Sequence, residues 1–353
     1  MDILSIVEAL GEGPTAAFFG LITGALFGIA AQRSAFCLRA ATVEFARGAL
    51  GPRMAVWLLT FSTALVWVQA AEMAGFMRSA DARMMAVTGS VSGAVIGGLL
   101  FGVGMVLARG CSGRLLVLAA TGNLRAVVSG LIFAVVAQMS LHGVLAPLRD
   151  KLATIWVTPG GRNIDLLDFA RLPEATGLVL GVVLAAVAVG LAARNKLGAG
   201  KLVFASGVGF AVAVGWVLTF ALSQVAFDPV QIESATFTGP SANTLMFLLV
   251  DNPVLEFDVG LVPGVFLGAF VAAALTREFR FQGFDGAGSM RRSMIGAALM
   301  GFGGMLAGGC AIGAGVTGGS IFVATAWLAL TCMWIGAVVT DIVVDQRLAL
   351  RPV

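Results

Sequence analysis

Residues Gly301 to Ser320 read GFGGMLAGGCAIGAGVTGGS, midway through a charge-free run from Ser293 to Thr340. At about 1.5 Å per residue, one helix of that length would be more than twice as long as the hydrocarbon core of a bilayer is thick. The run therefore predicts two membrane-crossing segments separated by a break that holds Cys310. Irregular backbone at membrane depth is tolerated only where it is buried in protein or lines a watery cavity. The surroundings of Cys310 are thus the first candidate functional site.

Composition indicates a membrane protein that crosses the bilayer many times. The chain has 353 residues, of which 59% are hydrophobic and 12% are charged, whereas soluble domains carry about 25% charged residues. The 47 glycines fit close helix packing and interrupted helices. With a net charge of +3 and no basic, aromatic-rich patch, we expect no nucleic-acid partner. Four cysteines without a CxxC pair and one histidine give no reason to expect a metal site or a cofactor.

Further charge-free segments, each near the length that a bilayer requires, precede the double run. They are Gly13–Gln32, Met54–Ala71, Met84–Ala108, Ala126–Leu148, Ala175–Ala193, Leu202–Phe227 and Val259–Thr276. We therefore predict an all-α polytopic membrane protein with about nine transmembrane helices, in a single transmembrane domain over residues 1–353. Short re-entrant helices are expected at the breaks, and Ser234–Val250 is either re-entrant or interfacial.

The distribution of charge predicts how the chain is oriented. Basic residues cluster in three places, at 33–53, 194–201 and 277–292, whereas the loop from Asp228 to Asp258 has acidic residues and no Lys or Arg. Because basic loops favour the cytoplasmic side, we predict a periplasmic N-terminus. The C-terminus, with Arg347 and Arg351, is then cytoplasmic.

An internal repeat is the strongest pattern in the sequence. Gly97–Cys111 reads GGLLFGVGMVLARGC and Gly296–Cys310 reads GAALMGFGGMLAGGC, which match without a gap at eight of fifteen positions. There are weaker echoes: Gly24–Gly28 leads to Cys37 much as the first segment leads to Cys111, and Gly20–Gly24 resembles Gly260–Gly264. We predict pseudo-symmetric halves at about 14–148 and 200–344, linked by a loop and helix at 149–199. Duplicated halves with interrupted hydrophobic segments in matching places point to a transport site near the bilayer midplane.

The residues around the breaks favour a soft anion as ligand. The N-termini of half-helices present free N–H groups and a positive dipole end. Arginines flank two of the cysteines, so the approaches are cationic: Arg33 and Arg39 beside Cys37, and Arg109 and Arg114 beside Cys111. A thiol in apolar surroundings stays protonated and is a weak S–H donor. Thiols in series would favour a sulfur-bearing anion over sulfate, whose hard oxygens need stronger donors.

Simpler interpretations stand beside these. A lone cysteine in a membrane helix usually only fills space, which is the reading we give Cys332. Arginines near segment ends are more often headgroup or loop anchors than ligands. Three acidic residues near segment ends, Glu44, Glu72 and Asp341, are expected to meet water or a nearby arginine, the alternative being a role as a proton carrier.

The Gly-Cys repeats at Cys111 and Cys310, with Cys37 after an Arg-rich turn, resemble the YeeE/YedE sulfur-transport family. The resemblance extends from about Gly20 to Thr340. It implies thiosulfate uptake across the bacterial inner membrane through an hourglass-shaped protein with a central constriction. There, three cysteines pass thiosulfate along by S–H···S contacts, and by motif these are Cys37, Cys111 and Cys310. The resemblance also implies a TusA-like cytosolic sulfurtransferase as a partner.

We therefore expect an inner-membrane importer of thiosulfate or a closely related sulfur-containing anion, and not an enzyme. The three cysteines would line the constriction as neutral thiols, and the four flanking arginines would attract the anion or hold the loops. Two other classes of function remain open at this point. One is a membrane thiol-redox protein using Cys111 and Cys310 as a reversible disulfide, and the other is a membrane scaffold that recruits a cytosolic sulfurtransferase.

Overall fold

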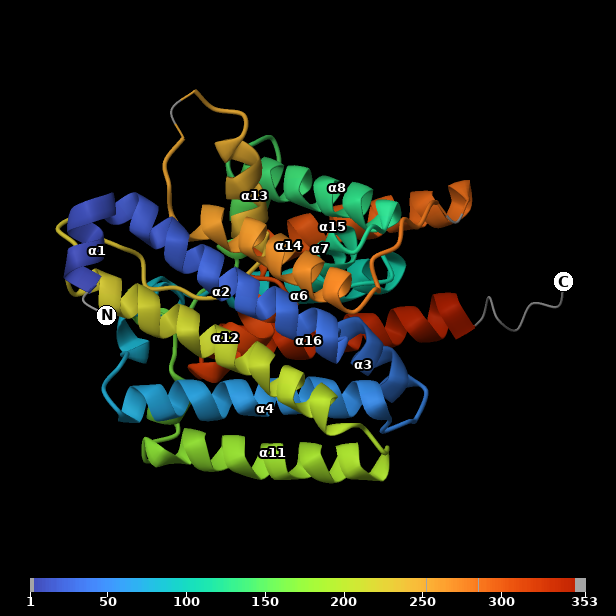
Figure 1. Cartoon of the computed structure of the whole chain (residues 1–353), viewed down its shortest axis with the longest axis horizontal. Helices are drawn as coiled ribbons and strands as arrows, with labels where there is room; N and C mark the ends of the chain where they lie inside the picture. The colour runs from blue at the N-terminus through green and yellow to red at the C-terminus, as the bar shows by residue number, and fades with distance from the viewer. Residues whose placement is uncertain (1–2, 252, 285, 347–353) are drawn as a thin grey trace, which may run out of the picture.

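The computed structural model describes residues 3–251, 253–284 and 286–346, and over these ranges the chain is helical with only isolated β-bridges. The axes of most of the long helices are roughly aligned, although the chain runs in opposite directions along some of them (Figure 1). They are α2 (Glu12–Ser34), α4 (Pro52–Met73), α6 (Val91–Leu107), α8 (Leu124–Leu141), α11 (Ala175–Arg194), α12 (Ala199–Ser223), α14 (Phe257–Leu275), α15 (Ala287–Leu306) and α16 (Ala324–Thr340). Within the described residues nine spans, built on these helices, are long and apolar enough to cross a membrane, which confirms the predicted number.

Short helices connect or interrupt the long ones. They are α1 (Ile3–Leu10), α3 (Leu38–Ala46), η1 (Ser79–Asp81), α5 (Arg83–Ala86), α7 (Ser112–Ala120), α9 (Ala146–Ala153), η2 (Pro159–Gly161), α10 (Leu166–Phe169), α13 (Thr238–Phe247), η3 (Ala311–Gly318) and η4 (Asp341–Gln346). The last two are wound as π-helices. α13 lies across the direction of the long helices (Figure 1), and its ten residues are too few to span a bilayer.

Two predicted segments are longer than the helices they contain. The segment from Met84 includes the separate turn α5, because Ser90 caps a new helix by accepting a 2.8 Å hydrogen bond from the backbone N–H of Gly93. The segment ending at Leu148 runs past the end of α8 into α9, whose first turn contains Pro147. Absence of charge marked the apolar stretch in both places, but caps and proline decide where each helix begins.

Helices α2 and α14 pack side by side through glycines on both surfaces. A Cβ added at Gly24 would lie 2.1 Å from the carbonyl oxygen of Leu261, and one at Gly264 would lie 2.4 Å from that of Leu21. Only a hydrogen at these positions permits such an approach. Gly20–Gly24 and Gly260–Gly264 therefore resemble each other because both form the packing face between two parallel helices. The resemblance does not make α2 and α14 corresponding helices of the repeat.

The matched glycines of the main repeat meet each other across the α6–α15 contact. A Cβ at Gly97 would lie 2.5 Å from the carbonyl oxygen of Gly303, and one at Gly296 would lie 2.5 Å from that of Gly104. Gly97 aligns with Gly296 and Gly104 aligns with Gly303, so the two contacts are equivalent and the helices run antiparallel. The repeat is thus inverted, with a pseudo-twofold axis across the helices.

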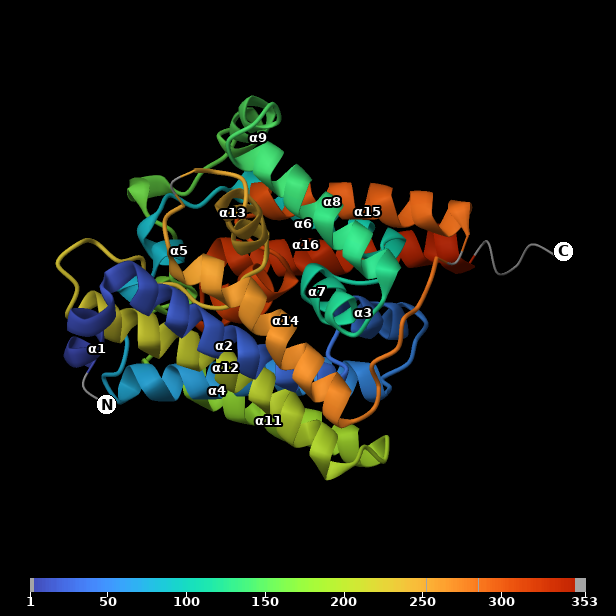
Figure 2. The same cartoon turned by 45° about the horizontal axis from the view of Figure 1, so that its top comes forward.

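The other helix contacts follow the same inverted symmetry. Helices α2, α3, α4, α6, α7 and α8 correspond in order to α12, α13, α14, α15, η3 and α16. α16 packs on α6 as α8 packs on α15, and α3 packs on α4 as α13 packs on α14. α11 belongs to neither set and packs on α4 at the edge of the molecule, as Figures 1 and 2 show.

Candidate functional site

Each of the three predicted cysteines stands at the start of a short helix that follows a break. Cys37 precedes α3, Cys111 precedes α7 and Cys310 precedes η3, and all three are buried. Two residues before each cysteine the backbone turns left-handed, at Ala35, Arg109 and Gly308. That conformation ends the preceding helix and redirects the chain. The local sequence therefore places each thiol beside the N-terminal turn of a half-helix, where anions are favoured.

The structure brings the side chains of Cys37 and Cys111 together, within reach of a thiol–thiol hydrogen bond. Cys310 caps its own helix, its Sγ accepting from the backbone N–H of Gly313 at 3.4 Å. The first turns of α7 and η3 are in contact, since a Cβ at Gly113 would lie 3.4 Å from Cγ1 of Ile312. The breaks of the two halves thus meet inside the protein.

A cavity of about 480 Å³ borders Cys37 and is strongly cationic. Its charged lining consists of one glutamate, Glu44, and five arginines: Arg39, Arg47, Arg53, Arg109 and Arg114. Three of these were predicted from their place beside the cysteines. The fourth predicted arginine, Arg33, lies outside the lining, with its guanidinium 3.9 Å from Glu278 and over the ring of Phe204.

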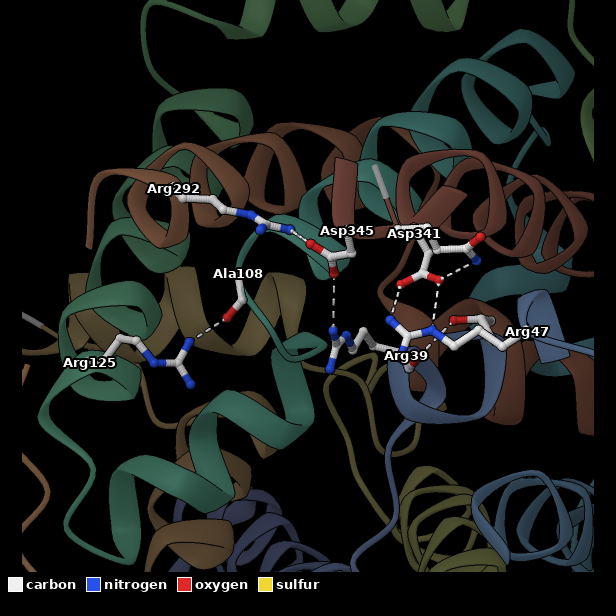
Figure 3. Close-up of polar contacts among 9 residues, drawn as sticks. Arg39, Arg47, Ala108, Arg125, Arg292, Asp341 and Asp345 are labelled. Atoms are coloured by element: carbon white, nitrogen blue, oxygen red, sulfur yellow. Dashed lines mark hydrogen bonds and ion pairs between the residues drawn. The ribbon is translucent and has the colours of Figure 1, made fainter. Parts of the chain in front are cut away.

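Two acidic residues of η4 neutralise part of this charge (Figure 3). Asp345 bridges Arg292 at 2.6 Å and Arg39 at 3.5 Å. Asp341, which is fully buried, forms a paired hydrogen bond with Arg47, as expected for an acidic residue near a segment end. The other two such residues cap backbone groups, Glu44 accepting from Met54 N–H at 2.8 Å and Glu72 from Ser79 N–H at 2.7 Å.

Among the residues that the structure describes, Arg114 forms no ion pair with an acidic side chain, unlike Arg39 and Arg47 of the same cavity. Its Nη1 is buried and makes no hydrogen bond with any residue that the structure describes. The residue is the third of α7, so its charge adds to the positive end of that helix. An anion that reached Cys37 through the cavity would find at Arg114 a donor that no carboxylate occupies.

The two ends of the bundle carry different cavities. One of about 850 Å³ is lined by Gln69, Glu72, Ile321 and Phe322, among others. It touches the end of α4, whereas the cationic cavity touches Arg53 at the start of α4, and a helix of 22 residues separates them by roughly 30 Å. Gln69, from α4, donates to the carbonyl of Ser320 at 3.0 Å, just beyond η3. The cavity of about 850 Å³ therefore adjoins the C-terminal end of η3, the half-helix that Cys310 precedes.

Comparisons with known proteins show the family to which the chain belongs. The family model described as Sulphur transport matches residues 33–339. The chain belongs to the Sulphur transport family. It is 29% identical over 348 residues to the thiosulfate transporter TsuA of Escherichia coli, covering 90% of this chain and 91% of that protein. It is 26% identical over 328 residues to the thiosulfate transporter TsuA of Spirochaeta thermophila, covering 88% and 93%. The predicted family is thereby confirmed.

Sequence reasoning missed several residues of this candidate site. Arg47 and Arg53 line the cationic cavity, although they follow Cys37 by many residues. Arg125 donates to the carbonyl of Ala108 at 2.7 Å and to Ser293 at 3.2 Å, which satisfies the end of α6 just before the Cys111 break. That contact is drawn in Figure 3. The only hint in the sequence was a charged residue at the first turn of an otherwise apolar segment.

Proposed function

We propose that this protein carries thiosulfate across the bacterial inner membrane into the cell, through the constriction formed by the three cysteine-capped half-helices. The supporting observation is the convergence of buried cysteine side chains and half-helix N-termini next to an arginine-lined cavity. Membership of the Sulphur transport family and likeness to two thiosulfate transporters support the choice of anion.

Within this proposal the predicted residues take different roles. Cys37, Cys111 and Cys310 donate S–H groups to the terminal sulfur of the anion in turn. Arg114 and Arg109 attract the dianion at the cationic cavity, Arg39 does so while exchanging its contact with Asp345, and Arg33 holds the end of α2 to Glu278.

The proposed orientation puts the N-terminus in the periplasm and the cationic cavity on the cytoplasmic side. It rests on the excess of basic residues beside that cavity and on the acidic loop 228–258 at the other end of α12. The two arginines at the C-terminus, Arg347 and Arg351, lie outside the described residues. An anion leaving through an arginine-lined mouth is well placed for transfer to an acceptor, for which we propose a TusA-like sulfurtransferase.

Purified protein in liposomes tests the proposal directly. Labelled thiosulfate should enter protein-containing vesicles faster than empty ones, and sulfate should compete poorly, because its hard oxygens gain little from S–H donors. Entry of label without any accessory protein would rule out a purely scaffolding role. A thiol-redox protein would instead show no flux and would form a disulfide under oxidant, which mass spectrometry of the four free cysteines would detect.

A further inference from the structure

The acidic residues on the far side of the constriction form a buried group that the proposed path of the anion does not use. Glu233 precedes α13 and is 8% exposed, and Asp258 in the first turn of α14 is 2% exposed. One oxygen of each, Oε2 of Glu233 and Oδ1 of Asp258, is buried and accepts no hydrogen bond from the residues that the structure describes. Buried carboxylates are normally paired or neutralised.

Among the residues that the structure describes, one cation faces this pair. Arg83 Nη1 lies 3.4 Å from Oε2 of Glu233, and the same nitrogen donates to Gln231 at 2.9 Å. Asn243 donates to the other oxygen of Asp258 at 2.9 Å, and the remaining charged neighbour, Glu256, is acidic. One arginine cannot neutralise two buried carboxylates, so the arrangement favours one bound proton.

The site is open to water on one side. A cavity of about 280 Å³ reaches Glu233, and its charged lining is wholly acidic: Glu12, Asp228, Glu233 and Glu256. Glu12 begins α2, whereas the cationic cavity touches Ala35 just past the other end of α2. The acidic and cationic cavities therefore lie at opposite ends of one long helix. Acidic linings attract protons and repel anions.

A short stretch of chain ties the site to the constriction. Four residues after Glu233, the ring of Phe237 packs on Phe27 with centroids 4.9 Å apart and would lie 3.2 Å from a Cβ at Gly113, two residues after Cys111. Between them, the carbonyl of Ala235 accepts a hydrogen bond from Thr317 of η3. The wall of the constriction is thus continuous with Glu233.

We propose that Glu233 and Asp258 form a proton-binding site, and that a proton bound there from the acidic cavity moves with the anion across the constriction. The inference rests on the proposed function, since it supplies the coupling that uptake of a dianion requires. Moving negative charge into a negative-inside cell is electrically unfavourable, and each accompanying proton cancels one charge. The proton stays a proton throughout, passing from water to a carboxylate and back to water.

The protonation state supports this assignment. Burial and the negative charge of nearby Asp258 together raise the pKa of Glu233 to about 8, against the opposing effect of Arg83. Because a raised pKa keeps the carboxyl protonated below that value, the site is loaded at neutral pH and empties as the pH rises. Wild-type uptake should therefore fall as external pH rises through about 8.

The decisive experiment uses the full chain in liposomes that contain a pH dye. An inward thiosulfate gradient should acidify the lumen in wild-type vesicles, and E233Q and D258N should abolish that acidification and flatten the pH profile while leaving downhill thiosulfate entry measurable. E256Q is the matched control, because Glu256 lines the same cavity but is exposed, and it should keep the acidification of the lumen. Thiosulfate entry without acidification in the wild type, or acidification that persists in both variants, overturns the inference. So does entry that requires sodium ions at constant pH.

A second measurement does not depend on transport. Infrared spectroscopy of the purified protein near pH 7 should detect a protonated carboxyl C=O stretch that disappears in E233Q and D258N but not in E256Q. Absence of this band would contradict the proposed proton-binding site, even if thiosulfate enters the vesicles. If the band is present but no thiosulfate crosses the membrane, the proposed function fails, and with it the coupling, while the proton-binding site itself stands.

Discussion

The breaks that precede α3 and α13 occupy corresponding places in the two inverted halves but carry opposite charges. The first reads Arg33-Ser34-Ala35-Phe36-Cys37, and the second reads Glu233-Ser234-Ala235-Thr236-Phe237, each ending one residue before its short helix. The first leads to an arginine-lined cavity and the second to a buried carboxylate pair. A shared fold thus supports different chemistry at its two ends.

The other pair of breaks has diverged less. Cys111 and Cys310 both occupy the position just before their short helices, but the third residue of the helix is Arg114 in α7 and Gly313 in η3. A Cβ at Gly313 would lie 2.2 Å from Oγ1 of Thr236, so no side chain fits there. At these two breaks the halves therefore keep the glycines and cysteines that set the geometry, while the arginines occur only beside Cys111.

The largest effect should follow from removing the thiol of either corresponding cysteine, Cys111 or Cys310. C111A and C310A should each reduce thiosulfate uptake to background, because alanine offers no S–H donor at the constriction, while expression and folding persist. C332A is the control, since Cys332 lies on α16 and packs against Gly98 of α6. Near-normal uptake in C310A alone would break the comparison, because the two cysteine caps would then not be functionally equivalent.

Arg114 offers a test of the asymmetry itself. Losing a charge-assisted hydrogen bond costs about 1.5–3 kcal/mol, so R114Q should raise the KM for thiosulfate by at least about tenfold. R33Q is the matched control, because Arg33 lies outside the cavity, and its KM should stay close to wild type. Equal effects of the two substitutions on KM would mean that general positive charge, and not the Arg114 donor, attracts the anion.

Local sequence patterns predicted some parts of the structure and could not predict contacts between distant residues. The charge-free runs and the Gly-Cys repeats were enough to predict nine crossings, the breaks and the three cysteines, because each is a local pattern. The convergence of Arg47 and Arg53 on Cys37 depends on how the loop between α3 and α4 folds back toward α7. Likewise, the pairing of Asp341 with Arg47 joins residues far apart in the chain. No local pattern encodes such contacts.

The repeat shows a second limit. Sequence identity between Gly97–Cys111 and Gly296–Cys310 revealed a duplication but not its direction, which the antiparallel contact of α6 with α15 supplies. The echo between Gly20–Gly24 and Gly260–Gly264 was misleading, because two helices that pack closely need glycine for the same steric reason. The match of Ser34-Ala35 with Ser234-Ala235 was available in the sequence and marks the true correspondence.

Glycine packing should matter more for stability than for transport. G24A should lower the melting temperature in detergent, because a Cβ there would lie 2.1 Å from the carbonyl oxygen of Leu261, and overpacking costs about 1–3 kcal/mol. G130A is the control, since nothing lies within 4 Å of a Cβ at that position on α8. If both substitutions left the melting temperature unchanged, the α2–α14 contact would be looser than the structure describes.

The smallest expected effect concerns Asp341, an acidic residue of the second half that pairs with Arg47 of the first half. α8 ends at the exposed His142, whereas its counterpart α16 continues into η4 and places Asp341 on Arg47. Arg47 is half-exposed, so the pair contributes about 0.2–1 kcal/mol. D341N should therefore release Arg47 into the cavity and lower the KM for thiosulfate by less than about fivefold, with little change in maximal rate. A KM that rises instead would show that Asp341 holds Arg47 where the anion binds, and the second half would then contribute to substrate binding at the cationic end as well.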